Sequence, residues 1–471
     1  MKLGLVGPSY VERSIPFDAQ RCINLFPTVN ETGGGKEVAA LYGTPGLLLF
    51  SEIGAGPIRG EFASANGRAF VVSGSGLYEV FSNGASTLLG TLDGSSSICS
   101  ITENVTQLVI CDGAVLYTLT YSSNVFAKVT DVDLPGAATV TFQDQYIIVN
   151  RPDTGEFYIS DQGDATAWAA LDFSTAESSP DKLVRVFSAY GQLWLLGVTT
   201  TEVWYNSGDS TFPFARIEGA KMQQGCIAPH SVVDMDNTIF WLGQDKDGKG
   251  IVYAASGYSA SRISTHAIEF AIRQATDMSM IRGYSYQEDG HLFYALTGGG
   301  LATTLVYDAA TKLWHERAYL EADGSLSTHR ATCHMFAFGK HLVGDKSEGK
   351  IYEQSLDYFD DNGDEIRRQR VFTHLHNNGK RFNANNIQVG FETGVGLTTG
   401  QGSVPVCWLE TSNNGGRTWG PELQASIGAK GEYEKRVVWR RLGQFTNMTP
   451  RLTITDPVKV AICGAYLNDD L

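Results

Sequence analysis

The stretch Arg68–Val80, RAFVVSGSGLYEV, decides the fold class of this chain. Two apolar arms, Ala69–Val72 and Leu77–Val80, flank a turn of glycine and serine. Short apolar runs that alternate around such turn residues are typical of β-hairpins. The second arm carries a hydrophobic residue followed directly by a tyrosine, Leu77-Tyr78, and this pair makes the hairpin easy to find elsewhere in the chain.

The same kind of pair recurs along the chain, each time after another apolar run and a turn. Successive aromatic positions lie 39, 41, 46, 49, 54 and 45 residues apart. Units of this length with three or four strands are typical of β-propeller blades, which bury their faces against neighbouring blades. We therefore predict an all-β fold with a propeller of six or seven blades; two tandem β-sandwiches are the alternative. The pairs are Leu77-Tyr78, Leu116-Tyr117, Phe157-Tyr158, Val203-Trp204, Val252-Tyr253, Val306-Tyr307 and Ile351-Tyr352.

The repeat sets the expected domain limits. Residues 1–54 are aperiodic, and we expect an extended N-terminal arm and first strands there. Residues 55–370 are expected to form the propeller. Residues 371–471 break the repeat but keep strands of alternating hydrophobicity, which predicts an additional C-terminal β-domain of sandwich type. Helix is expected only near 265–275, where apolar residues follow helical spacing.

Composition agrees with a folded protein rich in turns. The 471 residues include 52 glycines, 42% are hydrophobic and 11% aromatic, which excludes fibrous and disordered classes. The formal net charge is −15, which argues against DNA or anionic-membrane binding through a general basic face. The charge is uneven, because ten basic and eight acidic residues fall after residue 370. The acidity therefore belongs to the predicted propeller.

The sequence predicts neither a cofactor nor a metal site. The seven cysteines are scattered and lack a C-x-x-C pair, which favours buried free thiols. His374 and His376 lie at strand spacing but have no third ligand nearby. The acidic turns at 245–250 and 357–365 lack a complete calcium-loop pattern, so hairpin turns are favoured. No apolar run is long enough to span a bilayer, and no membrane insertion is expected.

The segment 434–441, EKRVVWRR, supplies the candidate interface residues. It combines a tryptophan with alternating Arg and Lys residues, and tryptophan and arginine are enriched at protein interfaces. A half-buried strand with a solvated charged face explains the same pattern equally well. The candidate interface residues are Trp439, Arg440, Arg441, Lys435 and Arg436.

The segment Ser412–Trp419, SNNGGRTW, resembles the Asp-box hairpin of sialidases and related propellers. Asn414 stands where that motif has aspartate. The resemblance implies a fold-stabilising turn remote from any active site. It leaves open an alternative function, a glycan-binding or glycan-hydrolysing propeller.

Several longer strings carry a resemblance that covers most of the chain. Together and in this order, they are similar to the packaged-DNA stabilisation, or tail hub, proteins of short-tailed bacteriophages. The strings are INLFP (23–27) and GTPGL (43–47), FYISDQGDATAWAALDFSTAESSPDKLVRV (157–186), TTTEVWYNSGDSTFPFARIEGAKMQQGCIAPHSVV (199–233), YDAATKLWHERA (307–318), NNGGRTWGPELQ (413–424) and YEKRVVWRRLG (433–443).

This resemblance implies a non-enzymatic structural protein of the virion tail, assembled in the host cytoplasm. Its implied partners are five more copies in a homo-hexameric ring, the portal adaptor protein, a tailspike or tail fibre, and a tail needle or plug. The ring would continue the DNA channel and help to retain packaged DNA, with double-stranded DNA passing non-specifically. An acidic body suits such a conduit, because it repels DNA.

Overall fold

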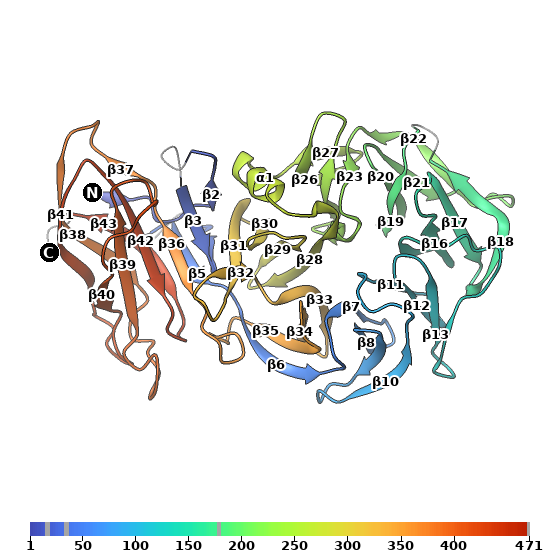
Figure 1. Ribbon diagram of the computed structural model, residues 1–471, viewed down its shortest axis with the longest axis horizontal. Helices are drawn as coiled ribbons and strands as arrows, with labels where there is room; N and C mark the ends of the chain where they lie inside the picture. The colour runs from blue at the N-terminus through green and yellow to red at the C-terminus, as the bar shows by residue number, and fades with distance from the viewer. Residues whose placement is uncertain (15–18, 33–36, 177–179, 469–471) are drawn as a thin grey trace.

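The computed structural model describes residues 1–14, 19–32, 37–176 and 180–468. Figure 1 shows a ring of β-sheets beside a second all-β part, which contains the C-terminal strands and several strands from the N-terminus. Two 3-10 turns, η1 (Pro229–Ser231) and η2 (Met278–Met280), and one α-helix, α1 (His266–Arg273), complete the elements of the described chain. The helix lies inside the segment where helical spacing predicts it.

Seven antiparallel sheets form the ring, each with its first strand innermost. The first blade contains β7 (Ile58–Ala63), β8 (Ala69–Ser73), β9 (Gly76–Val80) and β10 (Ser86–Thr91). The second contains β11 (Ser100–Glu103), β12 (Gln107–Cys111), β13 (Leu116–Thr120) and β14 (Val125–Lys128). The third contains β15 (Val140–Gln143), β16 (Tyr146–Asn150), β17 (Glu156–Asp161) and β18 (Asp164–Thr175). The fourth contains β19 (Leu183–Ala189), β20 (Gln192–Gly197), β21 (Thr201–Asn206) and β22 (Phe214–Met222).

The remaining three blades follow the same plan with additions. The fifth contains β23 (Gly225–Cys226), β24 (Val233–Met235), β25 (Thr238–Gln244), β26 (Lys249–Ser256) and β27 (Ser259–Arg262). The sixth contains β28 (Ile281–Glu288), β29 (His291–Gly298), β30 (Thr304–Asp308) and β31 (Leu313–Leu320), with β32 (Leu326–Thr328) beside β31. The seventh contains β33 (Ala331–Ala337), β34 (Lys340–Asp345) and β35 (Lys350–Ser355), and its fourth strand is β6 (Gly46–Glu52).

The recurring hydrophobic-aromatic pairs all occupy one structural position. Each pair lies on the third strand of its blade, from Leu77-Tyr78 on β9 to Ile351-Tyr352 on β35. The hydrophobic member is buried in every blade, for example Leu77 and Ile351 at 0% exposure. The prediction of an all-β propeller, rather than two tandem sandwiches, is confirmed, and the number of blades is seven.

The ring is closed by a strand from the N-terminal end of the chain. β6 runs antiparallel to β35, with Glu52 opposite Lys350 and Gly46 opposite Ser355. The innermost strands contact one another around the whole circle, and β33 of the last blade packs on β7 of the first. Closure in this way leaves no blade with an uncovered face.

The second part is a β-sandwich built from both ends of the chain. One sheet has the order β4 (Leu25–Val29), β5 (Ala39–Gly43), β43 (Ala461–Leu467), β38 (Phe382–Phe391) and β41 (Val437–Phe445), with β1 (Lys2–Leu3) beside β43. The other has β3 (Ala19–Ile23), β36 (Arg368–Val371), β42 (Asn447–Ile454), β39 (Val406–Ser412) and β40 (Leu423–Ser426), with β2 (Tyr10–Val11) and β37 (Leu375–His376) at its sides. A core that includes Leu41, Ile387, Leu409 and Met448 lies between the two sheets.

The second sandwich sheet is continuous with the sixth blade. β3 pairs in parallel with β31, where Ile23 lies beside Glu316, and antiparallel with β36, where Ile23 lies beside Gln369. The strands of residues 1–54 are therefore shared between the two parts: β6 completes the propeller, while β1, β4 and β5 complete the sandwich. The domain limits at residues 54 and 370 stay a prediction.

Candidate interaction surface

The predicted interface residues lie on and beside β41, the outermost strand of its sheet. Trp439 is only 3% exposed and belongs to the sandwich core. Its indole Nε1 donates a hydrogen bond of 2.7 Å to the carbonyl oxygen of Leu423 in β40. Trp439 can therefore serve an interface only indirectly, by holding in place the strand that carries the cations.

The four cations of the segment are exposed and together form what we call the cationic edge: Lys435, Arg436, Arg440 and Arg441. None of them makes a side-chain hydrogen bond or an ion pair with a residue in the described part of the chain. Arg441 has φ 62°, and the register of β41 against β38 shifts at this point, which marks a β-bulge. Charges and a bulge on an outer strand prevent unspecific strand pairing, and they leave the cations free to meet an acidic partner.

The Asp-box-like hairpin joins β39 to β40 in the sandwich and is not part of the propeller. Its polar atoms bind one another: the Asn414 carboxamide oxygen accepts from the Thr418 N–H at 2.9 Å, and its nitrogen donates to the Thr418 hydroxyl at 2.7 Å. The Ser412 hydroxyl accepts from the Gly416 N–H at 2.8 Å. Trp419 is covered by the Arg451 guanidinium, 4.0 Å from its ring centre. These contacts stabilise a turn and leave no reactive group.

Buried arginines hold the joint between propeller and sandwich. Arg370, at 0% exposure, donates to the carbonyl oxygen of Leu5 at 2.6 Å and to the Gln20 side chain at 2.7 Å. Arg317, at 1% exposure, donates to the carbonyl oxygen of Pro45 at 2.8 Å. Burying a guanidinium is costly unless its N–H groups form hydrogen bonds, and here these bonds tie the N-terminal strands to the rest of the chain.

An ion pair crosses the same joint. Arg21 of β3 donates through Nε to Glu316 of β31 at 3.1 Å, and the Thr303 hydroxyl donates to the same carboxylate at 2.7 Å. Burial alone would raise the pKa of Glu316, but the Arg21 charge and these hydrogen bonds hold it below its ordinary value. The carboxylate is therefore charged at neutral pH and pairs the sixth blade with the sandwich.

A cavity of about 410 Å³ lies at this joint, lined by both parts of the molecule. Sequence reasoning does not find it or the buried arginines around it, although the basic run Arg367-Arg368-Gln369-Arg370 was an available signal. Its lining includes Tyr42, Thr44, Asp289, Asp357, Arg368 and Lys459.

No catalytic or metal-binding group emerges from the described residues. In the part of the chain that the structure covers, no three His, Cys, Asp or Glu side chains come together as a metal site would require. A hydrogen bond of 2.7 Å joins His374 Nδ1 to the Thr449 hydroxyl, and His376 is exposed. The acidic turn at Asp245 accepts backbone N–H bonds from Asp247 and Gly248, as a hairpin turn does. Within the same ranges, no helix is long and apolar enough to cross a bilayer.

The arrangement of a propeller followed by a sandwich has a match among protein families. Residues 1–358 match the family described as Bacteriophage P22 Gp10, beta-propeller, and residues 367–468 match Bacteriophage P22 Gp10, beta-sandwich. The chain belongs to the P22 Gp10 family. This finding confirms the predicted resemblance to phage tail hub proteins, and with it the prediction of a structural protein rather than an enzyme.

One relative of the Gp10 family and two solved structures show how far the similarity extends. The tail hub protein gp10 of Salmonella phage P22 is 23% identical over 302 residues, so this chain spans 62% of that relative's length, less than two thirds. The N-terminal domain of Nup159 matches at 10% identity and a TM-score of 0.41, over 71% of this chain and 98% of that one. The Pan2 WD40 domain of Neurospora crassa matches at 9% identity and a TM-score of 0.42, over 65% of this chain and 94% of that one.

Proposed function

We propose that this chain is a tail hub protein of a phage virion, located in the tail. The observation that carries the proposal is the match of both of its parts, in order, to the propeller and sandwich of one Gp10 family. A closed propeller joined to a sandwich by a continuous sheet is a stiff body with many surface loops, which suits a protein that holds several partners in fixed positions.

The finer proposal is a ring of six copies below the portal adaptor, which continues the DNA channel and helps to retain packaged DNA. In this ring the chain would also hold a tailspike or fibre and a needle or plug. Support comes from the charge: the first 370 residues carry all of the net negative charge, and a negative wall repels the phosphates of passing DNA.

The experiment that tests the hub proposal measures the assembly state of the full chain. Mass photometry and negative-stain microscopy are expected to show six-fold rings, alone or on a portal–adaptor complex, with a mass about six times the 51.1 kDa of one chain. A protein that stays monomeric at all concentrations and does not bind the portal–adaptor complex would refute it. A glycan array and a glycosidase panel test the alternative; silence is expected, because the polar atoms of the Asp-box-like hairpin bind one another.

We also propose that the cationic edge contacts an acidic surface of a neighbouring subunit in the tail. Its four cations have no partner among the described residues, while the propeller of a second copy is strongly acidic. Arg440→Glu with Arg441→Glu is expected to weaken assembly, and raising the salt concentration is expected to weaken the wild-type assembly in the same direction. The control is Arg417→Glu, which changes a cation of the Asp-box-like hairpin outside the cationic edge. Assembly that is equally sensitive to both changes would contradict this assignment.

A further inference from the structure

Three basic side chains meet near the axis of the propeller. Arg185 is the third residue of β19, Arg282 is the second residue of β28, and His230 lies in η1, directly before β24. These are the inner elements of blades four, six and five. Inner strands of successive blades run in the same direction along the axis, so the three side chains stand at the same end of it.

Close packing of these elements brings the three groups together. η1 contacts both β19 and β28. Gly283 of β28 has no room for a side chain, because a Cβ atom there would lie 2.6 Å from the carbonyl oxygen of Ser231. The Tyr294 hydroxyl donates to that same carbonyl at 2.7 Å and fixes η1 in place. His230 is thereby held next to Arg282.

Two nitrogen atoms of the Arg185 guanidinium are buried without a polar partner among the described residues. Its Nε and Nη1 atoms have no solvent-accessible surface and no hydrogen-bond partner among the described residues. The guanidinium lies over the face of Phe187, 5.7 Å from the ring centre. Burial lowers the pKa of Arg185 to about 10, which still leaves it charged at neutral pH. An unpaired buried charge is costly, so a protein that retains one has a use for it.

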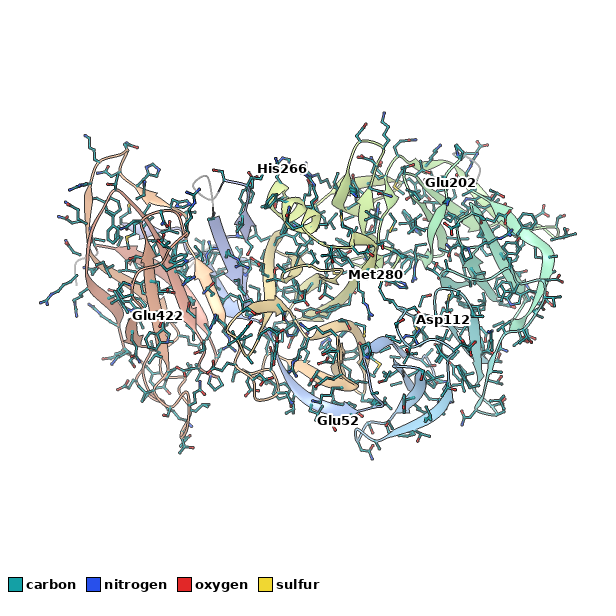
Figure 2. All side chains as sticks on the ribbon, viewed as in Figure 1. Glu52, Asp112, Glu202, His266, Met280 and Glu422 are labelled. Carbon is teal, nitrogen blue, oxygen red and sulfur yellow. The ribbon has the colours of Figure 1, made fainter. Side chains whose placement is uncertain are left out.

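The neighbouring groups do not neutralise this charge. Arg282 donates one hydrogen bond, to the carbonyl oxygen of Ile58 at 3.1 Å, and makes no ion pair with a described residue. Burial and the two arginine charges hold the pKa of His230 well below its ordinary value, so its ring is neutral and can donate one N–H. Figure 2 labels Met280, which directly precedes β28, near the middle of the propeller and Asp112 to one side of it. The Asp112 carboxylate accepts from the N–H groups of Ala114 and Val115 and forms no ion pair with a residue that the structure describes.

We propose that Arg185, His230 and Arg282 form a binding site for a phosphate-class oxyanion at this end of the propeller axis. Two arginines with unused N–H groups and one imidazole N–H, approaching from three elements, match the several acceptor oxygens of a tetrahedral anion better than the two of a carboxylate. All three side chains are partly exposed, so an anion can reach them from solvent. The site concerns a ligand within one chain and goes beyond the proposed assembly function.

The direct test is calorimetric titration of the full chain with inorganic phosphate in phosphate-free buffer at constant ionic strength. One saturable site per chain is expected, with acetate binding much more weakly. Arg185→Gln and Arg282→Gln are each expected to lower phosphate affinity at least about tenfold, because each removes a charged donor. The matched control Arg417→Gln, an exposed arginine of the sandwich, is expected to bind as the wild type does. Titration with AMP distinguishes a free phosphate from a phosphate ester as the preferred source.

A second readout covers variants that fold poorly. Phosphate is expected to raise the melting temperature of the wild-type chain in a saturable manner, while Arg185→Gln is expected to melt no lower than the wild type without phosphate and to gain nothing from its addition. Unsaturable stabilisation that is equal in the wild type and Arg185→Gln would be a general salt effect and would overturn the proposal. The absence of phosphate binding to the wild-type chain would overturn it regardless of the variants.

Discussion

The indole N–H of Trp439 donates to the carbonyl oxygen of Leu423 over 2.7 Å, and this bond joins the outer strands of the two sandwich sheets. A residue that looks like a surface anchor in the sequence thus closes one side of the C-terminal core. The exposed cations around it are held by a rigid strand, which is a requirement for a specific contact.

Two substitutions of Trp439 separate the contribution of side-chain packing to stability from that of the hydrogen bond. Trp439→Phe keeps most of the ring but removes the bond to Leu423, and we expect a loss of about 1 kcal/mol in the free energy of unfolding. Trp439→Ala also leaves a cavity, and the expected loss is about 3–5 kcal/mol. Urea denaturation measures both. Arg440→Gln, on the same strand but exposed, is the control and should change stability by less than about 0.5 kcal/mol. Equal losses for the control and Trp439→Ala would contradict the core assignment.

Closure of the propeller can be tested on two neighbouring residues of β6. Leu47 is 1% exposed and packs in the core between the sixth and seventh blades, while Leu48 is 45% exposed. Leu47→Ala is expected to destabilise the chain by about 2–5 kcal/mol, and Leu48→Ala by less than about 0.5 kcal/mol. Thermal and urea unfolding of the two variants provide the measurement. If the two substitutions cost the same, β6 does not occupy the position described.

Glu61 of the first blade should make stability fall as pH rises. Its carboxylate oxygens are buried, and no described residue forms a hydrogen bond of normal geometry with them. Burial raises the pKa of Glu61 to about 8 from 4.5, and weaker contacts with the Cys333 thiol and the Gly344 N–H offset only part of this rise. The folded chain thus binds a proton that the unfolded chain has lost between about pH 4.5 and 8, and stability decreases across this window. Glu61→Gln is expected to be more stable than the wild type at pH 9 by roughly 2–4 kcal/mol, and the difference should vanish below pH 4.5. Urea denaturation at several pH values measures it. Glu52→Gln, at an exposed position labelled in Figure 2, should show no such trend.

The ion pair between Arg21 and Glu316 has the opposite effect, because it should make stability fall as the pH falls. The pKa of Glu316 in the folded state lies below its ordinary value of 4.5. The ion pair therefore adds its full contribution to the free energy of unfolding above pH 4.5, and this contribution is lost as the pH falls through the folded-state pKa. Arg21→Gln leaves the buried carboxylate without its cation. Because 35% of the Arg21 side chain is exposed, we expect a moderate loss of about 1–2 kcal/mol at pH 7. The difference in the free energy of unfolding between Arg21→Gln and the wild type should become smaller at acidic pH. Lys182→Gln, which breaks an exposed pair with Asp153, is the control; a loss of the same size there would argue against a special role of the joint.

The local sequence pattern was sufficient to predict the propeller, but it did not show which strand closes the ring. The pairs from Leu77-Tyr78 to Ile351-Tyr352 mark the third strand of each blade, because each blade buries the same position against its neighbour. The fourth strand of the seventh blade could not be assigned in this way. β6 lies about 300 residues before its partner β35, and periodicity within a strand carries no information on which distant strand pairs with it.

Prediction of the candidate site from the sequence had the same limit. The cations of the cationic edge are exposed, as the pattern allows, but the burial of Trp439 depends on packing against a second sheet that the segment itself does not reveal. The axial group of Arg185, His230 and Arg282 was not found from the sequence. Its members lie in three different blades and no spacing connects them; only the circular arrangement of the inner strands does.

The pairing of β6 with β35 has a consequence during synthesis. At about 5–20 residues per second, a ribosome needs roughly 15–60 s to make the stretch between these strands, so β6 waits unpaired for that time. The sandwich waits longer, because β1, β4 and β5 require strands made after residue 380. A chain that stops before β35 completes neither part, and one that stops between β35 and β43 completes only the propeller. Only full-length copies can therefore offer finished surfaces to one another, and prematurely terminated products are kept out of any larger particle.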